Sequence, residues 1–185
     1  LYGAIEFYTK AHHKGVNPIL GCEAYIVRGD ATTKPAPGEK RKRHHITLLA
    51  KNNAGWKNLC HLSSQSWIKG FNRKPCIDKN MLAQHSEGLI ALSGCMSGEV
   101  AQAILAKDEE AAIRAANEYA SILGQENLYL EVMSNGVSGQ KVIQDGMNAI
   151  AQKTGLPLVA TNDIHYRCPG GHITQDALIC IGTGQ

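Results

Sequence analysis

The sequence predicts an α/β domain, and three observations lead to this prediction. Hydrophobic residues make up 43% and charged residues 19% of the 185 residues, which suits one globular domain with a sizeable core. Short apolar runs alternate with segments whose apolar residues recur at helical spacing. No G-x-G-x-x-G and no Walker loop follow a predicted strand, which disfavours dinucleotide and P-loop folds.

The composition excludes several other classes. The net charge of +3 is too small to indicate nucleic-acid binding by itself. The six cysteines form no C-x-x-C pair, which argues against a zinc ribbon and a disulfide scaffold and favours reduced, cytoplasmic thiols. No apolar run approaches the length of about 18 residues that a membrane span needs.

Helical spacing and glycine stops predict the helices. Ile5 and Tyr8 fall on one face of a first helix, which ends at Gly15; Gly124 and Gly155 end two later helices. The expected helices cover residues 1–14, 53–69, 100–106, 109–123, 140–153 and 173–181.

Short apolar runs predict the strands, at residues 18–27, 44–50, 89–93, 128–132 and 156–161. Residues 28–43 form a loop rich in Gly, Pro, Lys and Arg, and residues 74–78 form a turn in which Asp78 caps a helix. Because helices separate most of the strands, we expect a mainly parallel sheet, and a barrel is the favoured architecture.

Candidate functional residues follow the ends of the predicted strands, where a parallel barrel places its active site. Glu23, Cys95, Asp163 and His165 obey this rule, and such a donor set suits Zn²⁺, Mn²⁺ or Fe²⁺. Clustered ions of this kind activate water and hold a phosphate ester. His45 begins its strand, so parallel-barrel geometry would place it at the wrong end.

Plainer interpretations stay open for these residues. In extended chain Asp163 and His165 would point to one side, as metal ligands or as an acid–base pair. Alternatively, Asp163 caps the next helix and His165 lies on the surface. Glu23 is either a ligand or a solvent-facing residue of its strand.

A basic run ends the loop, at Arg41, Lys42 and Arg43. A solvated loop is its plain interpretation, and a contact with a phosphate backbone is the alternative. Glu131 ends another strand and is a candidate to orient a metal ligand without binding the metal itself.

Several blocks carry a family resemblance from one end of the chain to the other. They include Gly21-Cys22-Glu23-Ala24-Tyr25, Ser93-Gly94-Cys95 and Asn162-Asp163-Ile164-His165, within residues 2–8, 18–25, 45–52, 87–95, 129–131 and 158–166. The chain resembles the PHP (polymerase and histidinol phosphatase) domain of bacterial replicative DNA polymerase III α subunits.

The resemblance implies a distorted seven-stranded (β/α) barrel, similar to a TIM barrel, with a divalent metal cluster. The ligands that it implies are Glu23, His45, Cys95, Asp163 and His165, with Asp163 and His165 also catalytic. It thus includes His45, which strand geometry alone does not. The implied activity is metal-dependent phosphoester hydrolysis, proposed for the family as 3′–5′ exonuclease proofreading.

The resemblance also implies that residues 1–185 are a fragment of a PHP domain. The family's opening His-x-His, its Asp-His-Gly block and its first strands would precede Leu1, and the Mg²⁺-dependent polymerase domains would follow Gln185. The expected partners are DNA, a proofreading exonuclease subunit and a sliding clamp. Two alternatives remain: a stand-alone phosphatase like histidinol phosphatase, and a metal-free scaffold for the exonuclease subunit.

Overall fold

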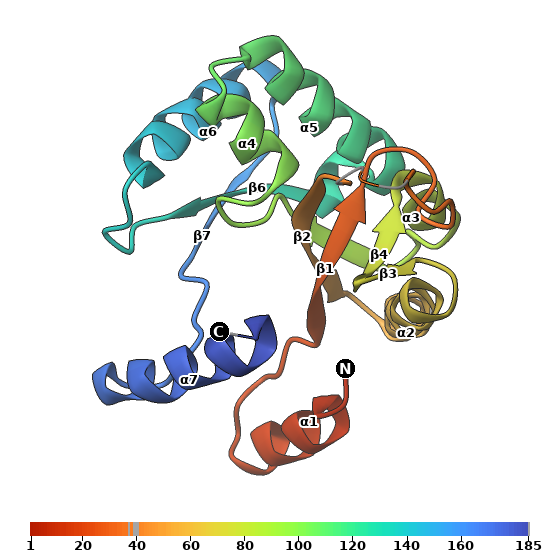
Figure 1. The fold of residues 1–185 in the computed structure, drawn as a ribbon, viewed down its shortest axis with the longest axis vertical. Helices are drawn as coiled ribbons and strands as arrows, with labels where there is room; N and C mark the ends of the chain where they lie inside the picture. Colours follow the sequence, from red (N-terminus) through yellow and green to blue (C-terminus); the bar gives the residue numbers. More distant parts are fainter. Residues whose placement is uncertain (37, 39–40, 185) are drawn as a thin grey trace.

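The computed structural model describes residues 1–36, 38 and 41–184 and contains one mixed seven-stranded sheet (Figure 1). The strands lie in the order β3-β4-β1-β2-β5-β6-β7. Their bounds are β1 Gly21–Val27, β2 Arg43–Ala50, β3 Phe71–Asn72, β4 Lys74–Asp78, β5 Leu89–Leu92, β6 Leu128–Met133 and β7 Leu158–Thr161. The α/β class predicted from the sequence is confirmed.

The helices also match the sequence pattern closely. Their bounds are α1 Ala4–His13, α2 Asn53–Ile68, α3 Lys79–Gln84, α4 Glu99–Leu105, α5 Glu109–Leu123, α6 Gln140–Thr154 and α7 His172–Thr183. Asp78 caps α3 as expected, because its carboxylate accepts a hydrogen bond of 2.8 Å from the backbone N–H of Met81. The short helices η1 Gln125–Asn127 and η2 Pro169–Gly171 complete the described elements.

The strand directions differ from the prediction of a mainly parallel sheet. The pairs β1–β4, β5–β6 and β6–β7 are parallel, whereas β1–β2, β2–β5 and β3–β4 are antiparallel. No helix separates β1 from β2, so the connecting loop lets β2 return beside β1 in the opposite direction. Barrel closure stays a prediction, because no pairing joins β3 to β7 among the described residues.

Residues 74–78 form strand β4 and not the predicted turn. Pro75 suggested a turn because it lacks a backbone N–H. It lies opposite Phe71 in the short β3–β4 hairpin, while Cys76, Ile77 and Asp78 pair with β1. The three paired residues are buried, so tertiary packing overrides the local turn signal.

The hydrophobic core lies on one face of the sheet. Ile46 and Leu48 of β2 are buried there, together with residues of α2, α3, α5 and α6. Helices α4, α5 and α6 pack against one another beside this face (Figure 1). The alternate residues of β2 point to the opposite face, and His45 is among them. This second face positions the candidate site.

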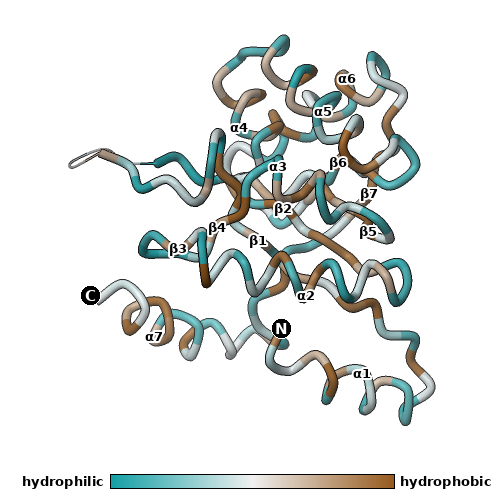
Figure 2. Tube along the Cα trace, turned by 90° about the vertical axis from the view of Figure 1, so that its right-hand side faces the viewer, coloured by the Kyte–Doolittle hydropathy of each residue, from teal (hydrophilic) through white to brown (hydrophobic). Residues whose placement is uncertain are grey.

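Helices α1 and α7 lie away from the main body, as both Figure 1 and Figure 2 show. Neither contains a buried residue. Figure 2 shows apolar stretches along both helices. Ile5 of α1 and Ile173 and Ile181 of α7 are largely exposed. Within the described part of the chain, no helix has the length and apolar character that crossing a membrane requires.

Candidate metal centre

Strands β1 and β2 bring Glu23 and His45 together on the face of the sheet opposite the core. Tyr25 pairs with His45, and Glu23 pairs with Thr47, so the two side chains lie diagonally across the antiparallel ladder. The Glu23 carboxylate contacts Nδ1 of His45 directly. The Tyr25 ring lies edge-on to the imidazole, with 4.9 Å between ring centroids. Because β2 is antiparallel to both neighbours, its first residues lie at the end of the sheet where β1 and β5 finish.

Cys95 joins this pair from the loop after β5. Its Sγ lies 3.5 Å from Nδ1 of His45. The ligand atoms of Glu23, His45 and Cys95 all lie within 4.8 Å of one another. Three residues from different parts of the chain therefore form a compact set of carboxylate, imidazole and thiol donors.

Gly94 lets the Cys95 loop approach β2 closely. Its φ of +87° lies in the left-handed region, and a Cβ at this position would collide with the backbone oxygen of His45. The loop is tied to the start of β2, because the backbone N–H of His45 donates to the carbonyl of Ser97 at 3.1 Å. Backbone packing, in addition to side-chain contacts, thus places Cys95 beside His45.

Contacts within the donor group shift the pKa values of His45 and Glu23. Hydrogen bonds to Cys95 and to Glu23 raise the pKa of His45 to about 10. The hydrogen bond from His45 lowers the pKa of Glu23. The imidazole thus contacts both the Glu23 carboxylate and the Cys95 thiol. A metal ion would bind the neutral imidazole, so binding would compete with protonation of His45.

Asp163 and His165 lie in the segment after β7, outside this group of three. The predicted buried strand is shorter and more exposed than expected, because β7 ends at Thr161 and Leu158 is 41% exposed. Asp163 has a φ of +49°, so the chain is not extended there. His165 lies 3.8 Å from the Asp163 carboxylate, measured from Nδ1, and its charge contributes to the lowered pKa of Glu23. Whether the two residues are metal ligands stays a prediction.

Glu131 lies on β6, behind the Cys95 loop and β7. Its side chain is buried, and Oε1 accepts a hydrogen bond of 2.5 Å from the Thr161 hydroxyl. Oε2 is buried without a hydrogen-bond partner in the part of the chain that the structure describes. Burial raises the pKa of Glu131, and the negative charges of Asp163 and Glu23 act in the same direction. This position suits the predicted role of orienting the metal ligands without binding the metal itself.

The basic run comes just before His45 in the chain, and its side chains divide between two hollows. Arg41 donates to the carbonyl oxygens of Ala31 and Thr33, and Arg43 donates to the carbonyl of Asn72. Arg41 lines both hollows, Arg43 lines one of them, and Lys42 lines the other. Glu39 and Lys40, which precede these residues, lie outside the described residues.

The buried carboxylate of Glu99 was not predicted from the sequence. Its oxygens lie 2.7 Å from Nε of Arg28 and 2.8 Å from Nζ of Lys79. The Tyr119 hydroxyl also donates a hydrogen bond of 2.8 Å to this carboxylate. Burial raises the pKa of Glu99, but its hydrogen bonds with Lys79 and Arg28 outweigh this effect and lower the value to about 2. The only sequence signal was an acidic residue in the first turn of a helix, which is common without any such network.

Comparisons with known proteins show which family the chain belongs to. The PHP domain family matches residues 1–135. The chain is 36% identical over 183 residues to the DNA polymerase III subunit alpha of Treponema pallidum, covering 99% of this chain and 16% of that protein. It is 38% identical over 184 residues to the protein of the same name from Borreliella burgdorferi, a match that covers 100% of this chain and 16% of that protein. It is 42% identical over 167 residues to the protein of the same name from Thermus aquaticus, a match that covers 90% of this chain and 14% of that protein.

The chain therefore spans about a sixth of the length of these relatives. Its matching region includes Glu23, His45 and Cys95, the three donors that the fold brings together. The family that the sequence blocks suggested is thus supported both by the match and by the donor cluster, and the chain belongs to the PHP domain family.

Proposed function

We propose that this chain is the PHP part of a bacterial replicative DNA polymerase of the DNA polymerase III α type, and that it hydrolyses phosphodiesters as a 3′–5′ exonuclease with bound divalent metal. The proposal about the whole protein rests on relatives with that name along the full chain. The proposal about chemistry rests on one observation, the convergence of Glu23, His45 and Cys95.

The donor set fits a borderline divalent ion. Carboxylate, imidazole and thiol donors together suit Zn²⁺, Mn²⁺ or Fe²⁺ better than Mg²⁺, which prefers oxygen ligands. Glu23 is 44% exposed at its side chain, so a substrate phosphate can reach the cluster from solvent. Such an ion, when bound, lowers the pKa of a bound water and neutralises phosphate charge.

Asp163 and His165 are proposed to complete the ligand set and to handle protons. Nδ1 of His165 lies 2.8 Å from the carbonyl oxygen of Asp163, which can only accept a hydrogen bond. In the neutral ring Nε2 is then the free acceptor, available to a metal ion or to a proton. Glu131 is proposed to hold Thr161 and, through it, the segment that carries both residues.

Further proposals concern the whole protein. We expect DNA, a proofreading exonuclease subunit and a sliding clamp as partners, with Mg²⁺ in the polymerase domains and a cytoplasmic location. We also propose that residues 1–185 belong to a PHP domain that closes into a barrel.

A metal-free scaffold is the second candidate function. One observation favours it: His45 and Glu23 already neutralise each other, and Cys95 also contacts His45. A site that satisfies its own donors does not need an ion for stability. The partner of such a scaffold would be the proofreading exonuclease subunit.

Metal analysis separates the two candidates. The protein is purified without chelator, and bound Zn, Mn and Fe are measured by mass spectrometry for the parent, for Cys95→Ser and for the matched control Cys60→Ser. Cys60 lies on α2, outside the donor group. The proposal expects stoichiometric metal in the parent and the control and a loss in Cys95→Ser, together with metal-dependent release of 3′ nucleotides from DNA. Absence of metal and activity in the parent would support the scaffold.

A further inference from the structure

A second feature of the surface lies at the start of β2, beside the 28–43 loop. The described residues line an open hollow there of about 620 Å³. Its charged lining residues are Lys34, Arg41, Arg43 and Arg73, all of them cations. No carboxylate lines the hollow in the described part of the chain. Among the described residues, the wall of the hollow therefore carries positive charge alone.

The hydrogen bonds of two of these cations go to uncharged groups in the part of the chain that the structure describes. The guanidinium of Arg41 donates there to the backbone carbonyls of Ala31 and Thr33, and Nη2 of Arg43 donates to the carbonyl of Asn72 at 2.8 Å. Nε of Arg43 is buried with no hydrogen-bond partner among the described residues. Lys34 and Arg73 are exposed, and neither has an ion pair within that same part of the structure. An anionic ligand would supply negative charge and a hydrogen-bond acceptor for these groups.

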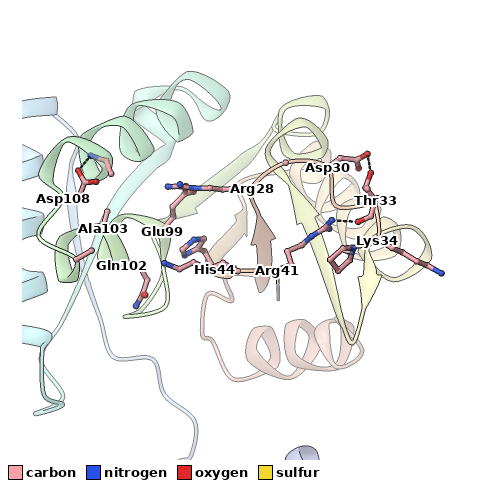
Figure 3. Close-up of a pocket in the computed structure, with 15 residues that line it drawn as sticks. Arg28, Asp30, Thr33, Lys34, Arg41, His44, Glu99, Gln102, Ala103 and Asp108 are labelled. Carbon is pink, nitrogen blue, oxygen red and sulfur yellow. Dashed lines mark hydrogen bonds and ion pairs between the residues drawn. The ribbon is translucent and has the colours of Figure 1, made fainter. Parts of the chain in front are cut away.

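The neighbouring hollow differs because carboxylates line it (Figure 3). It has a volume of about 690 Å³ and shares Lys34 and Arg41 with the first hollow. However, Glu99 and Asp108 also line it, and Arg28 is already paired with Glu99. A polyanion is therefore better accommodated in the hollow without carboxylates.

The hollow at the start of β2 also presents an aromatic surface. Phe71 lines it and is 49% exposed. The ring of Phe71 is stacked on Trp67, with 5.3 Å between centroids and 13° between planes, and Trp67 is also half exposed. Exposed aromatic rings beside a row of cations are the features with which proteins hold single-stranded nucleic acid, through base stacking and phosphate contacts.

The location links this surface to the metal centre. Arg43 and His45 are two residues apart on β2 and share the face opposite the core. Their Cα atoms are therefore separated by about 7 Å along the strand. The hollow therefore begins within two residues of the donor group along β2.

We propose that the hollow lined by Lys34, Arg41, Arg43, Arg73 and Phe71 binds the backbone of single-stranded nucleic acid and leads it to the metal centre. Binding follows from the hollow alone, while the direction of the strand rests on the proposed function. Of the predicted basic run, Arg41 and Arg43 belong to this surface, whereas Lys42 lines the neighbouring hollow.

The test measures binding of a short fluorescein-labelled oligothymidylate by fluorescence anisotropy, with EDTA present, over a range of salt concentrations. The variant Lys34→Gln/Arg73→Gln removes two exposed cations. The matched control Arg114→Gln/Lys141→Gln removes the same charge from α5 and α6. We expect the variant to bind about tenfold more weakly at low salt and to lower the slope of log affinity against log salt by about 1.4, with little change in the control. Circular dichroism checks that the variants fold.

A second variant tests the aromatic surface. Phe71→Ala should weaken oligothymidylate binding by at least about fivefold and leave binding of an abasic oligonucleotide of equal length unchanged. Equal losses in variant and control, or displacement of the oligonucleotide by poly-glutamate of equal charge at the same concentration, would overturn the proposal. Zn²⁺ titration of the same variants should match the parent, so failure of the hollow is distinguishable from failure of the metal centre.

Discussion

His45 contacts Cys95 across 50 residues of sequence, with Nδ1 of the imidazole 3.5 Å from the thiol sulfur. The contact exists because β2 runs antiparallel to β1 and β5. This direction brings the first residues of β2 to the end of the sheet where the loop after β5 begins. The donor group therefore depends on a strand direction that the sequence pattern alone did not predict.

The first prediction concerns the imidazole. His45→Ala should weaken Zn²⁺ binding by at least about tenfold, since even residues that only support a ligand contribute that much. Isothermal titration with Zn²⁺ measures the effect. His61→Ala is the matched control, because His61 lies on α2 beside His85 and outside the donor group. Equal affinities for the two variants would exclude His45 as a ligand.

The second prediction concerns the close approach of the Cys95 loop. Gly94→Ala should lower the free energy of unfolding by about 2–3 kcal/mol, because it combines an unfavourable φ with a collision against the His45 backbone. Gly136→Ala is the control, since Gly136 has a φ of +76° but no atom near its would-be Cβ. It should cost only about 1 kcal/mol. Urea denaturation measures both, and equal losses would refute the steric argument.

The third prediction concerns the buried carboxylate. Glu99→Gln should destabilise the fold by about 2–3 kcal/mol, because Lys79 and Arg28 would lose their shared counter-charge. Glu118→Gln removes another carboxylate that contacts Lys79, but Glu118 is 55% exposed. That control should cost less than about 1 kcal/mol. If the two variants unfold at the same urea concentration, the network around Glu99 contributes no special stability.

The fourth prediction concerns pH. The pKa of Glu99 is about 2 in the folded protein and 4.5 ordinarily. Because the folded-state pKa is the lower one, the stability that Glu99 contributes is present above pH 4.5 and is lost as the pH falls toward 2. The full loss is roughly 3 kcal/mol. Urea midpoints of the parent and Glu99→Gln should therefore differ at pH 7 and converge on acidification. A constant difference down to pH 3 would contradict this assignment.

Local signals predicted most elements well, for reasons that individual residues illustrate. The helix Glu109–Leu123 has the predicted bounds, because Asp108 caps its start and Gly124 stops it. Strand Leu89–Leu92 follows from its apolar run. Strand β4 was missed, because Pro75 is a turn signal whose missing N–H is tolerated in the hairpin with β3.

For the candidate site, too, local sequence predicted one part and tertiary contacts decided the other. The sequence by itself determined the residue types and their blocks, including Glu23, Cys95 and the pair Asp163 and His165, because donor chemistry and spacing are local properties. For His45 the family resemblance implied a place among the ligands, but only the tertiary structure supplied the physical reason, which is the antiparallel direction of β2. Only the tertiary structure decided that Glu99 is buried among cations. Strand direction and burial depend on contacts between residues far apart in the chain, and no local pattern of residues encodes them.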